Sequence, residues 1–358
     1  MARPIAWPSF QQRIAVAFVA TLAVPVHEWR TGDQGLMPLR YAPGKALPAR
    51  ARRVWIDTDA ACGTSRKTDP DDCLAIALLV QSQRFDIAGV STTFGNAALP
   101  VADATVDALM AHVPAQARRP FAWFSGAGGP IDPSSPQPTR GSLALARALE
   151  AQPLVIIALG PLTNIAEALR ARPDLRSRLV RLIAVMGRRP GHLFHPAAGI
   201  AARSFLGHGP IMRDFNYAQD PEAVALLLEM KLPLALVPYD AAVNVELTAA
   251  DLYRLATTGT AMRWAAEHAR AWLDYWQRDI GRRGLFPFDL VGAAYILMPA
   301  AFGCADVGVQ VERDAALFAP LTRPRGLLVS SAAAATAAQY CGRADMRLLD
   351  AITASAGQ

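Results

Sequence analysis

The sequence of 358 residues lacks the features that would mark a zinc-binding, nucleotide-binding or membrane-spanning protein. It has only four cysteines, and no CxxC pair or Cys/His spacing that indicates zinc. It has no Walker-type phosphate loop, no GxGxxG after an expected strand and no GxSxG nucleophile elbow. Its leading apolar run, residues 14–26, is too short to span a bilayer comfortably. The residues that could carry chemistry are instead a group of aspartates, described below.

The net charge of +6 belongs to the first residues rather than to the body of the chain. Residues 1–53 hold eight of the 36 Lys and Arg residues but only two of the 30 Asp and Glu residues. The rest of the chain carries 28 residues of each sign and is formally neutral. Because it also lacks a basic stripe interleaved with aromatic side chains, it predicts no nucleic-acid partner.

Residues 1–26 resemble a secretory signal peptide, with Arg13 before the apolar run and small residues within it. The part before the run is long and contains two prolines and a tryptophan, so a wrongly assigned start codon or a packed N-terminal strand is the alternative. Residues 27–52 are rich in Pro, Gly and Arg and predict a linker, followed by one domain over residues 53–358. We expect a periplasmic or secreted protein if the leader is a signal peptide and a cytoplasmic one otherwise, without stable membrane insertion.

Four aspartates surround one strand-to-helix junction in residues 54–72 (VWIDTDAACGTSRKTDPDD). Residues 54–56 are apolar and β-prone and predict a buried strand. Asp57 and Asp59 follow it and share one face, because strand side chains alternate. In an open α/β sheet, ligands bind at the carboxyl ends of the strands.

The other two aspartates, Asp71 and Asp72, are expected in the first turn of a helix over residues 71–83. Asp69 is the predicted N-cap of this helix and Pro70 its first residue. The helix macrodipole alone favours acidic residues at such a position, by about 0.3–1 kcal/mol each.

The macrodipole does not explain why Asp57 and Asp59 end an apolar strand. Carboxylates crowded in this way repel one another unless a cation joins them, and hard oxygen ligands suit Ca²⁺ or Mg²⁺. The cluster therefore predicts a site for a metal ion or a polyol, with simple helix capping as the alternative.

Strand and helix patterns alternate from residue 53 onward. This alternation is typical of a single α/β domain with a central, mostly parallel sheet flanked by helices. Residues 247–283 are expected to be helical and aromatic-rich. The expected strands are residues 54–56, 87–93, 121–125, 154–159, 179–186 and 234–238, and the expected helices are 71–83, 101–112, 142–151, 164–171 and 220–229.

The sequence does not decide whether the cysteines are disulfide-bonded or free. Cys62 and Cys73 flank the aspartate loop and would form a disulfide in an exported protein. Free thiols at these positions and at Cys304 and Cys341 are the alternative.

Trp272 and Trp276 lie four residues apart and share one face of an expected helix. This spacing is typical of core packing. The alternative is a lid over a flat aromatic ligand.

Four further motifs follow the aspartate loop in order: residues 89–96 (GVSTTFGN), 158–166 (ALGPLTNIA), 214–221 (DFNYAQDP) and 286–297 (FPFDLVGAAYIL). Together the five resemble the nucleoside hydrolases, the calcium-dependent N-ribohydrolases of the inosine-uridine-preferring and purine-preferring groups. The likeness runs from about residue 53 to the C-terminus. It implies a Rossmann-like domain, a small nucleoside substrate, Ca²⁺ as cofactor, and a homodimer or homotetramer.

The resemblance implies a metal site with a general base. The family opens with DxDPGxDD, whose second Asp is general base and calcium ligand, and Asp59 matches it. Asp72 matches the last Asp, a bidentate calcium ligand. Thr163 would supply a backbone carbonyl to the metal, and Asp289 would complete the ligand set and the catalytic pair.

The resemblance also implies a substrate site. Asp71 would hold a ribose hydroxyl, and Asn96 and Asn216 match ribose-binding asparagines. Asp214 stands where the family has Glu before Phe-Asn, and Phe288 would contact the base.

These residue types fit the cleavage of an N-glycosidic bond. A metal can acidify and orient a water molecule and hold the sugar diol, and an Asp beside that water can accept its proton. Further carboxylates suit the positive charge that develops on the sugar.

Two insertions depart from the family pattern. Eleven residues, 60–70, separate Asp59 from Asp71, where the family has three, and Ala60 replaces its Pro. The segment 187–213 is also longer and offers no Asn to match another ribose ligand. Loops accept insertions at little cost, so these are either harmless or a sign of changed substrate or lost activity.

The leaving-group side departs most. Inosine-uridine-type enzymes place a His general acid, worth roughly 10²–10⁴-fold, directly before the last Asp, where this chain has Phe288. The family's His-Gly after the third strand is Arg140-Gly141. The purine-preferring branch has an aromatic residue before this Asp and activates the purine by stacking, so the sequence leans to purines.

Other residues are candidates for the leaving-group side. Trp272 or Trp276 could form a second aromatic wall. Replacement acids could come from the long insert, which contains His192, His195 and His208.

Two other functions stay open at this level. The stretch IDTD resembles the DxD opening of haloacid-dehalogenase-like phosphohydrolases, although the later Lys and acidic pair of that family do not follow in order. A homologue that binds ribosides without cleaving them would also explain the insertions and the missing His.

Overall fold

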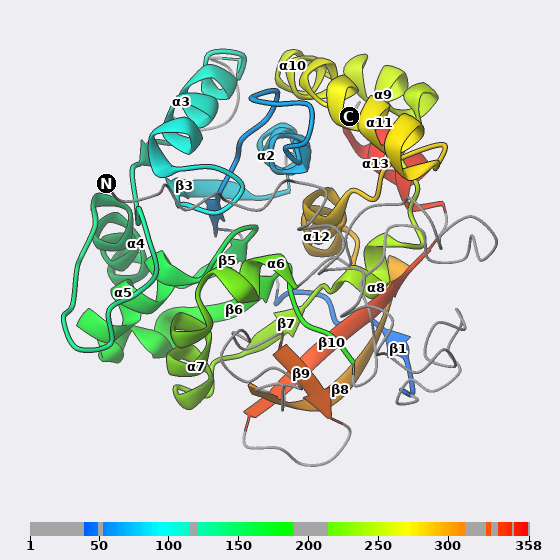
Figure 1. Cartoon of the computed structure of the whole chain (residues 1–358). Helices are drawn as coiled ribbons and strands as arrows, with labels where there is room; N and C mark the ends of the chain where they lie inside the picture. The colour runs from blue at the N-terminus through cyan, green and yellow to red at the C-terminus, as the bar shows by residue number, and fades with distance from the viewer. Residues whose placement is uncertain are drawn as a thin grey trace, which may run out of the picture.

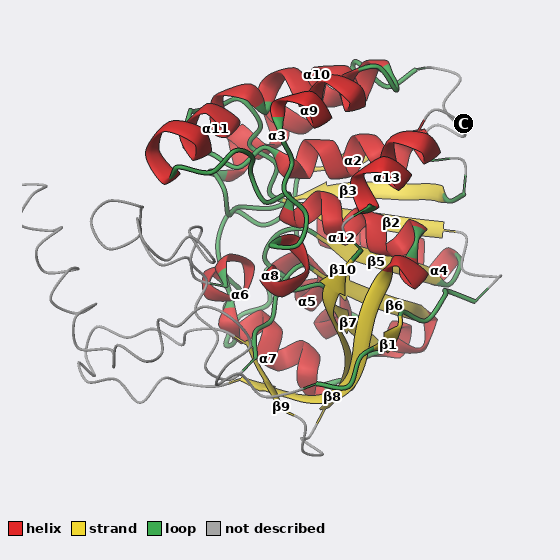
Figure 2. Cartoon of the chain, turned by 90° about the vertical axis from the view of Figure 1, so that its right-hand side faces the viewer, coloured by secondary structure: helices red, strands yellow, loops and turns green. Residues whose placement is uncertain are grey.

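The computed structural model describes residues 39–48, 53–82, 84–114, 121–189, 214–311, 327–330, 336–345 and 347–356. In these residues the chain forms an α/β domain with one sheet and helices on both of its faces (Figures 1 and 2). The predicted fold class is confirmed. The hydrophobic leader and the histidines proposed as replacement acids lie outside the described residues.

The sheet has ten strands in the described part of the chain. They are β1 (Ala42–Pro43), β2 (Arg53–Thr58), β3 (Asp86–Thr92), β4 (Trp123–Phe124), β5 (Leu154–Ala158), β6 (Leu179–Ala184), β7 (Leu234–Leu236), β8 (Phe302–Val311), β9 (Leu327–Ser330) and β10 (Thr336–Ala344). Their order is β1-β8-β10-β7-β6-β5-β2-β3-β4, with β9 beside β8. The strands from β10 to β4 are mutually parallel, whereas β8 is antiparallel to its neighbours.

The described helical segments follow the strands in the alternation that the sequence predicts. They are α2 (Asp71–Gln81), α3 (Leu99–Met110), α4 (Arg140–Ala151), α5 (Thr163–Ala171), η2 (Pro173–Arg178), α6 (Phe215–Gln219), α7 (Pro221–Glu229), α8 (Tyr239–Ala242), α9 (Ala249–Ala256), α10 (Thr260–His268), α11 (Arg270–Tyr275), the π-helix η4 (Trp276–Ile280), α12 (Phe288–Leu297), η5 (Pro299–Ala301) and α13 (Leu348–Ala356).

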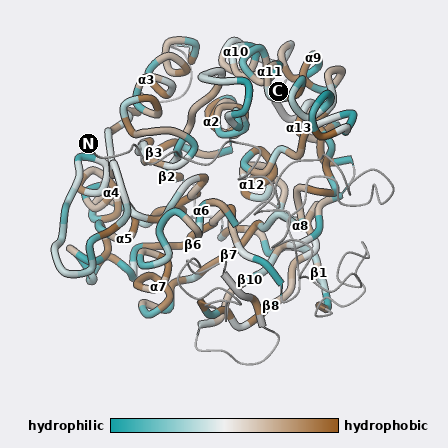
Figure 3. Tube along the Cα trace, in the orientation of Figure 1, coloured by the Kyte–Doolittle hydropathy of each residue, from teal (hydrophilic) through white to brown (hydrophobic). Residues whose placement is uncertain are grey.

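Strand side chains alternate between two cores, one on each face of the sheet. In β2, Val54 and Ile56 pack in the core that contains α2, α3 and α9 to α13, whereas Trp55 packs in the core that contains α4, α5 and α7. Figure 3 shows apolar colours along the central strands and α12. Both faces of the central strands are therefore covered, as expected for a parallel sheet.

The strand order reverses at β2. The chain builds outward from β2 through β3 to β4, then returns to β5 on the other side of β2 and continues to β6 and β7. In open α/β sheets a ligand crevice forms at such a switch point, at the carboxyl ends of the strands. Asp57 lies at this end of β2 and is paired with Ala158 of β5.

The start of α2 differs from the prediction. Pro70 occupies the N-cap position, with φ −100° and ψ 2°, and provides no side-chain cap. Asp69 lies one residue further out, where its Oδ1 accepts a hydrogen bond from the backbone N of Asp71 at 3.3 Å. The prediction of Asp69 as N-cap is therefore wrong, because proline takes the cap position and the carboxylate reaches the helix from outside it.

Two other predicted elements are shorter or broken. The strand expected over residues 121–125 is reduced to β4 at the edge of the sheet. The helical region expected over residues 247–283 is divided into α9, α10, α11 and η4, with Gly259 preceding α10.

All four cysteines form disulfides, Cys62–Cys73 and Cys304–Cys341. The alternative of free thiols is therefore wrong. The second pair is separated by 37 residues and is brought together by the antiparallel pairing of β8 with β10, which short-range spacing does not reveal.

Part of the segment expected to be a linker joins the sheet. Ala42 and Pro43 pair with β8 as the edge strand β1, a position that proline tolerates because its missing N–H faces no partner strand. Across the described residues, none of the helices combines the length and apolarity that crossing a bilayer would need.

Trp276 is fully buried and makes edge contacts with Trp272 and Phe286, so it is a core residue. We expect Trp276→Ala to lower the free energy of unfolding by about 3–5 kcal/mol, measured by urea denaturation. The control is Tyr253→Ala, which removes a side chain that is 73% exposed and should change this free energy by less than about 0.5 kcal/mol. A loss for Trp276→Ala no larger than the control's would contradict its place in the core.

Candidate active site

The predicted site residues converge at the carboxyl ends of β2, β3 and β5. Asp59 follows β2, Asn96 follows β3, and Thr163 begins the helix after β5. Asp59 and Thr163 are buried, and Asn96 is half-buried. The switch point of the sheet thus gathers residues that are far apart in the sequence.

Three carboxylates from two helix N-termini form the centre of the site. Asp71 and Asp72 begin α2, and Asp289 is the second residue of α12. One oxygen of each lies within 4.8 Å of the others. The backbone N of Asp289 donates to Oδ2 of Asp71 at 2.8 Å, so the two helix ends are joined directly.

Asn96 connects this triad with Asp59. Its backbone N donates to Oδ2 of Asp59 at 2.8 Å, and its Nδ2 donates to Oδ2 of Asp72 at 3.1 Å. Thr58 also donates its hydroxyl to Asp72. Gly95, at φ +154°, packs against Asp59 so closely that a Cβ there would lie 1.8 Å from its Oδ2.

The buried carboxylates raise one another's pKa. Burial, and then the charge of Asp72, raises the pKa of Asp59 well above its usual range. Burial and the charge of Asp71 raise the pKa of Asp72 to about 7. The pKa of Asp289 is raised well above its usual range by burial and then by the charges of Asp71, Asp72, Asp59 and Asp69. Without a counter-charge, these groups therefore resist ionisation.

The donor set fits a hard divalent cation. Oδ1 of Asp71 and Oδ1 of Asp289 are buried without a hydrogen-bond partner, so both are available as ligands. A cluster of carboxylate oxygens suits Ca²⁺ or Mg²⁺, which would also offset the repulsion that raises the pKa values. The site can therefore hold a metal ion, with Asp71 inside the cluster and Asp59 beside it.

Asp57 supports the site by linking β2 to β3 and to α5. Its Oδ1 accepts hydrogen bonds from the Ser91 hydroxyl and from Nδ2 of Asn164, at 2.8 Å for the latter. Asn164 also donates to the backbone O of Thr92 at 2.8 Å. Burial raises the pKa of Asp57 to about 7. Asn164 was not predicted as a site residue, although it follows Thr163 in the motif.

The predicted substrate residues lie at the next strand ends. Nδ2 of Asn216 donates to the backbone O of Leu159 and of Val185, at 2.6 and 2.9 Å, which ties α6 to the ends of β5 and β6. Oδ2 of Asp214 accepts from the backbone N of Gly187 at 2.7 Å. Both side chains are buried beside the start of the long insert.

The hydroxyl of Thr163 donates to Oδ2 of Asp220 at 2.5 Å. Asp220 also accepts from the backbone N of Ile131 at 2.8 Å and caps α7. This contact fixes the turn between β5 and α5. Asp220 lies within the motif at 214–221, but its partner is 57 residues away and could not be inferred from spacing.

An aromatic series leads from α11 to Phe288, which adjoins Asp289. The rings of Trp272, Trp276, Phe286 and Phe288 follow one another at 6.1, 5.0 and 6.4 Å between centroids. Tyr239 of α8, which was not predicted, stacks on Phe288 at 5.5 Å. Phe288 is half-buried, whereas Trp276 is fully buried.

The two described histidines, His112 and His268, both stack on Trp264. Arg140, at the position of the family's His, begins α4 and is exposed.

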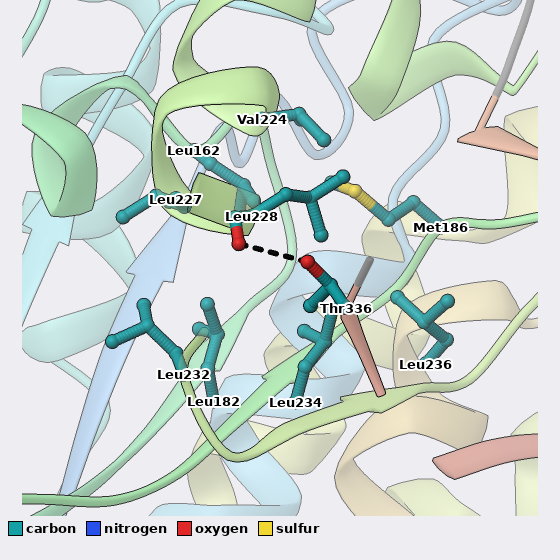
Figure 4. Close-up of a pocket in the computed structure, with 10 residues that line it drawn as sticks. All are labelled: Leu162, Leu182, Met186, Val224, Leu227, Leu228, Leu232, Leu234, Leu236 and Thr336. Atoms are coloured by element: carbon teal, nitrogen blue, oxygen red, sulfur yellow. Dashed lines mark hydrogen bonds between the residues drawn. The ribbon is translucent and has the colours of Figure 1, made fainter. Parts of the chain in front are cut away.

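Two described cavities lie away from the carboxylates. The one in Figure 4 is apolar, with Leu162, Met186 and Leu228 in its lining and Thr336 donating to the backbone O of Leu228. The other lies along α9, α10 and α11. Neither is lined by a predicted site residue.

Comparison with known proteins identifies the family of this chain. The model of the inosine-uridine preferring nucleoside hydrolase family matches residues 54–339. The pyrimidine-specific ribonucleoside hydrolase RihA of Citrobacter koseri is 25% identical over 268 residues, which cover 68% of this chain and 80% of that protein.

Solved structures show the same fold. A plant nucleoside hydrolase, PpNRh1, has a TM-score of 0.66 at 18% identity and covers 86% of this chain and 99% of its own. A purine-preferring ribonucleoside hydrolase from Gardnerella vaginalis has a TM-score of 0.62 at 17% identity, over 85% and 99% of the two chains. The family match decides against the phosphohydrolase alternative. The chain belongs to the inosine-uridine preferring nucleoside hydrolase family and is a ribonucleoside N-ribohydrolase.

Proposed function

We propose that the protein cleaves purine ribonucleosides in preference to pyrimidine ribonucleosides, with Ca²⁺ held by the carboxylates at the end of β2 and the starts of α2 and α12. The observation that carries the proposal is the convergence of Asp71, Asp72 and Asp289 within 4.8 Å, with Asp59 adjoining them through Asn96. Nothing in a structural role requires so many buried carboxylates together.

Asp72 and Asp289 would hold the cation, together with Asp59 and the backbone carbonyl of Thr163. A bound divalent cation would acidify a water molecule and orient the vicinal hydroxyls of the sugar. The unpartnered oxygens of Asp71 and Asp289 support a ligand at this place.

Asp59 would act as the general base that accepts the proton of the attacking water. Two hydrogen bonds from Asn96 fix the orientation of its carboxylate. The glycine at position 95 makes room for this carboxylate, because a Cβ there would lie 1.8 Å from Oδ2 of Asp59. The protein thus holds the base in one orientation before the substrate arrives, which is how positioned groups accelerate a reaction.

The sugar would lie between the carboxylate cluster and α6. Asp71 and Asn96 would bind ribose hydroxyls on one side, and Asp214 and Asn216 on the other. Because Nδ2 of Asn216 is bonded to two backbone carbonyls, its Oδ1 is the atom offered to the sugar.

The base would stack on Phe288, which also contacts the rings of Tyr239 and Phe286. A stacking wall stabilises a large bicyclic base better than a small one, because it buries more ring area. Relatives of both kinds exist, since RihA is named pyrimidine-specific and the Gardnerella protein purine-preferring. The aromatic residue before Asp289 supports the purine assignment.

Removing the charge of Asp59 tests the proposed base. We expect Asp59→Asn to lower kcat for nucleobase release from inosine by roughly 10²–10⁴-fold, with little change in KM. The matched control is Asp306→Asn, at the exposed partner of Lys45, which should keep the wild-type kcat. Full activity in folded Asp59→Asn protein would disprove this role.

The pH dependence of stability tests the buried carboxylates. In the metal-free fold the pKa of Asp72 is about 7, against 3.8 for an ordinary Asp, so the folded state holds a proton that the unfolded chain has lost between these values. Stability should therefore fall as pH rises through this window, by up to about 1.4 kcal/mol per pH unit for one group. Urea unfolding of protein stripped of metal with EGTA, at about pH 5, 6 and 7, should show this loss, and Ca²⁺ should remove it. A pH-independent stability in EGTA would contradict the burial of unpaired carboxylates.

Truncating the stacking wall tests the base preference. Phe288→Ala should lower kcat/KM for inosine by about tenfold more than for uridine, because the purine loses more stacking. The control is Tyr253→Ala, which removes an exposed side chain of α9 and should leave kcat/KM for both nucleosides nearly unchanged. An equal loss for the two substrates would show that Phe288 does not select the base.

A further inference from the structure

The eleven-residue insertion between Asp59 and Asp71 is attached to the rest of the protein at both its base and its tip. Residues 60–70 contain turns but no helix or strand. A link of this length would, if loose, let the strand-end aspartate and the helix-start aspartates move independently. Its contacts therefore decide how well the carboxylate site is preformed.

A disulfide closes the base of the insertion. Cys73 follows Asp72 directly, and Cys62 lies three residues after Asp59. The bridge thus joins the two chain segments that carry the proposed base and cation ligands. Cys62 is 4% exposed and Cys73 is fully buried, so the bridge is shielded from solvent and from reductants.

Arg66 anchors the tip of the insertion to the aromatic segment. Its Nε donates to Oδ2 of Asp274 on α11 at 3.1 Å, and its Nη2 donates to Oδ2 of Asp279 on η4 at 2.7 Å. Lys67 lies over the ring of Tyr275 at 5.5 Å. These contacts span more than 200 residues of sequence and join the carboxylate loop to the segment that carries Trp272 and Trp276.

Gly63 fixes the path of the insertion between these anchors. It has φ +72°, and a Cβ on it would lie 2.5 Å from Cδ2 of His268 on α10. The insertion therefore packs closely against a third helix of the same layer. Figures 1 and 2 show α10 and α11 on the same side of the sheet as α2.

We propose that the insertion is a positioning strap of the active site. The Cys62–Cys73 disulfide holds Asp72 in register with Asp59 for cation binding, and with it Asp71 for the ribose. Arg66 holds the segment α11–η4, and through its rings Phe288, in place for the base. The inference rests on the proposed function of the carboxylate site and assigns positioning roles to residues that do not touch the substrate.

The disulfide arm predicts a loss of metal affinity in folded protein. We expect the double variant Cys62→Ser, Cys73→Ser to bind Ca²⁺ about tenfold more weakly by calorimetry, because a flexible loop must then be ordered on binding. The matched control is Cys304→Ser, Cys341→Ser, which breaks the bridge between β8 and β10, with three strands between β10 and β2. This control should lower the melting temperature but keep the wild-type Ca²⁺ affinity.

The Arg66 arm uses a surface substitution that leaves the core intact. Arg66→Gln should raise KM for inosine about threefold to tenfold and leave Ca²⁺ affinity unchanged. The reason is that the substitution frees the segment α11–η4 and its aromatic rings, but leaves the disulfide beside the carboxylates intact. Arg172→Gln is its control, since Arg172 is an equally exposed residue that also bridges two carboxylates, those of Glu150 and Asp174, away from the site. It should keep the wild-type KM.

The outcomes separate the strap from the proposed function. Wild-type Ca²⁺ affinity in the Cys62/Cys73 variant, together with wild-type KM in Arg66→Gln, would overturn the strap and leave the proposed function standing. Equal loss of Ca²⁺ affinity in both disulfide variants would show a general effect of stability and would also overturn it. A wild-type protein that releases nucleobases without binding Ca²⁺ would overturn the strap and the metal assignment together.

Discussion

Mutual repulsion among buried carboxylates is the main constraint on the structure of the candidate active site. Asp59, Asp71, Asp72 and Asp289 are all at most 5% exposed, and burial raises the pKa of each. The charges of neighbouring carboxylates raise the pKa of Asp59, Asp72 and Asp289 further. A buried charge is tolerated only when an opposite charge or hydrogen bonds compensate it. The carboxylate cluster can therefore bind a metal ion, whose charge would offset this repulsion.

The fold places these groups with little freedom. The switch point of the sheet lies between β2 and β5, and the N-termini of α2 and α12 are joined by the hydrogen bond from Asp289 to Asp71. Both helix ends favour negative charge, which lowers the cost of assembling the cluster. Asn96 then fixes Asp59 against Asp72, so the proposed base and the proposed ligands form one hydrogen-bonded unit.

Local patterns in the sequence predicted the fold class and the aspartates at the end of β2 and the start of α2, whereas Asn96, Thr163 and Asp289 were named through the family resemblance. Apolar strands followed by Asp or Asn, and a helix that begins with two aspartates, depend on periods of two and 3.6 residues that short windows reveal. Long-range contacts were not visible in this way. The stacking of Tyr239 on Phe288, the support of Asp57 by Asn164 and the Cys304–Cys341 bridge each join residues from different elements. The position of Asp69 outside α2 was missed because Pro70 takes the cap without a capping side chain.

The dependence of hydrolysis on Ca²⁺ tests the proposed role of the buried carboxylates. Protein stripped with EGTA would be titrated with Ca²⁺ while ribose release from inosine is followed, and calorimetry would give the binding constant under the same conditions. We expect activity that is absent without Ca²⁺ and that saturates with the calorimetric Kd at one ion per chain. Ribose release that is independent of Ca²⁺, in protein that binds none, would contradict this role.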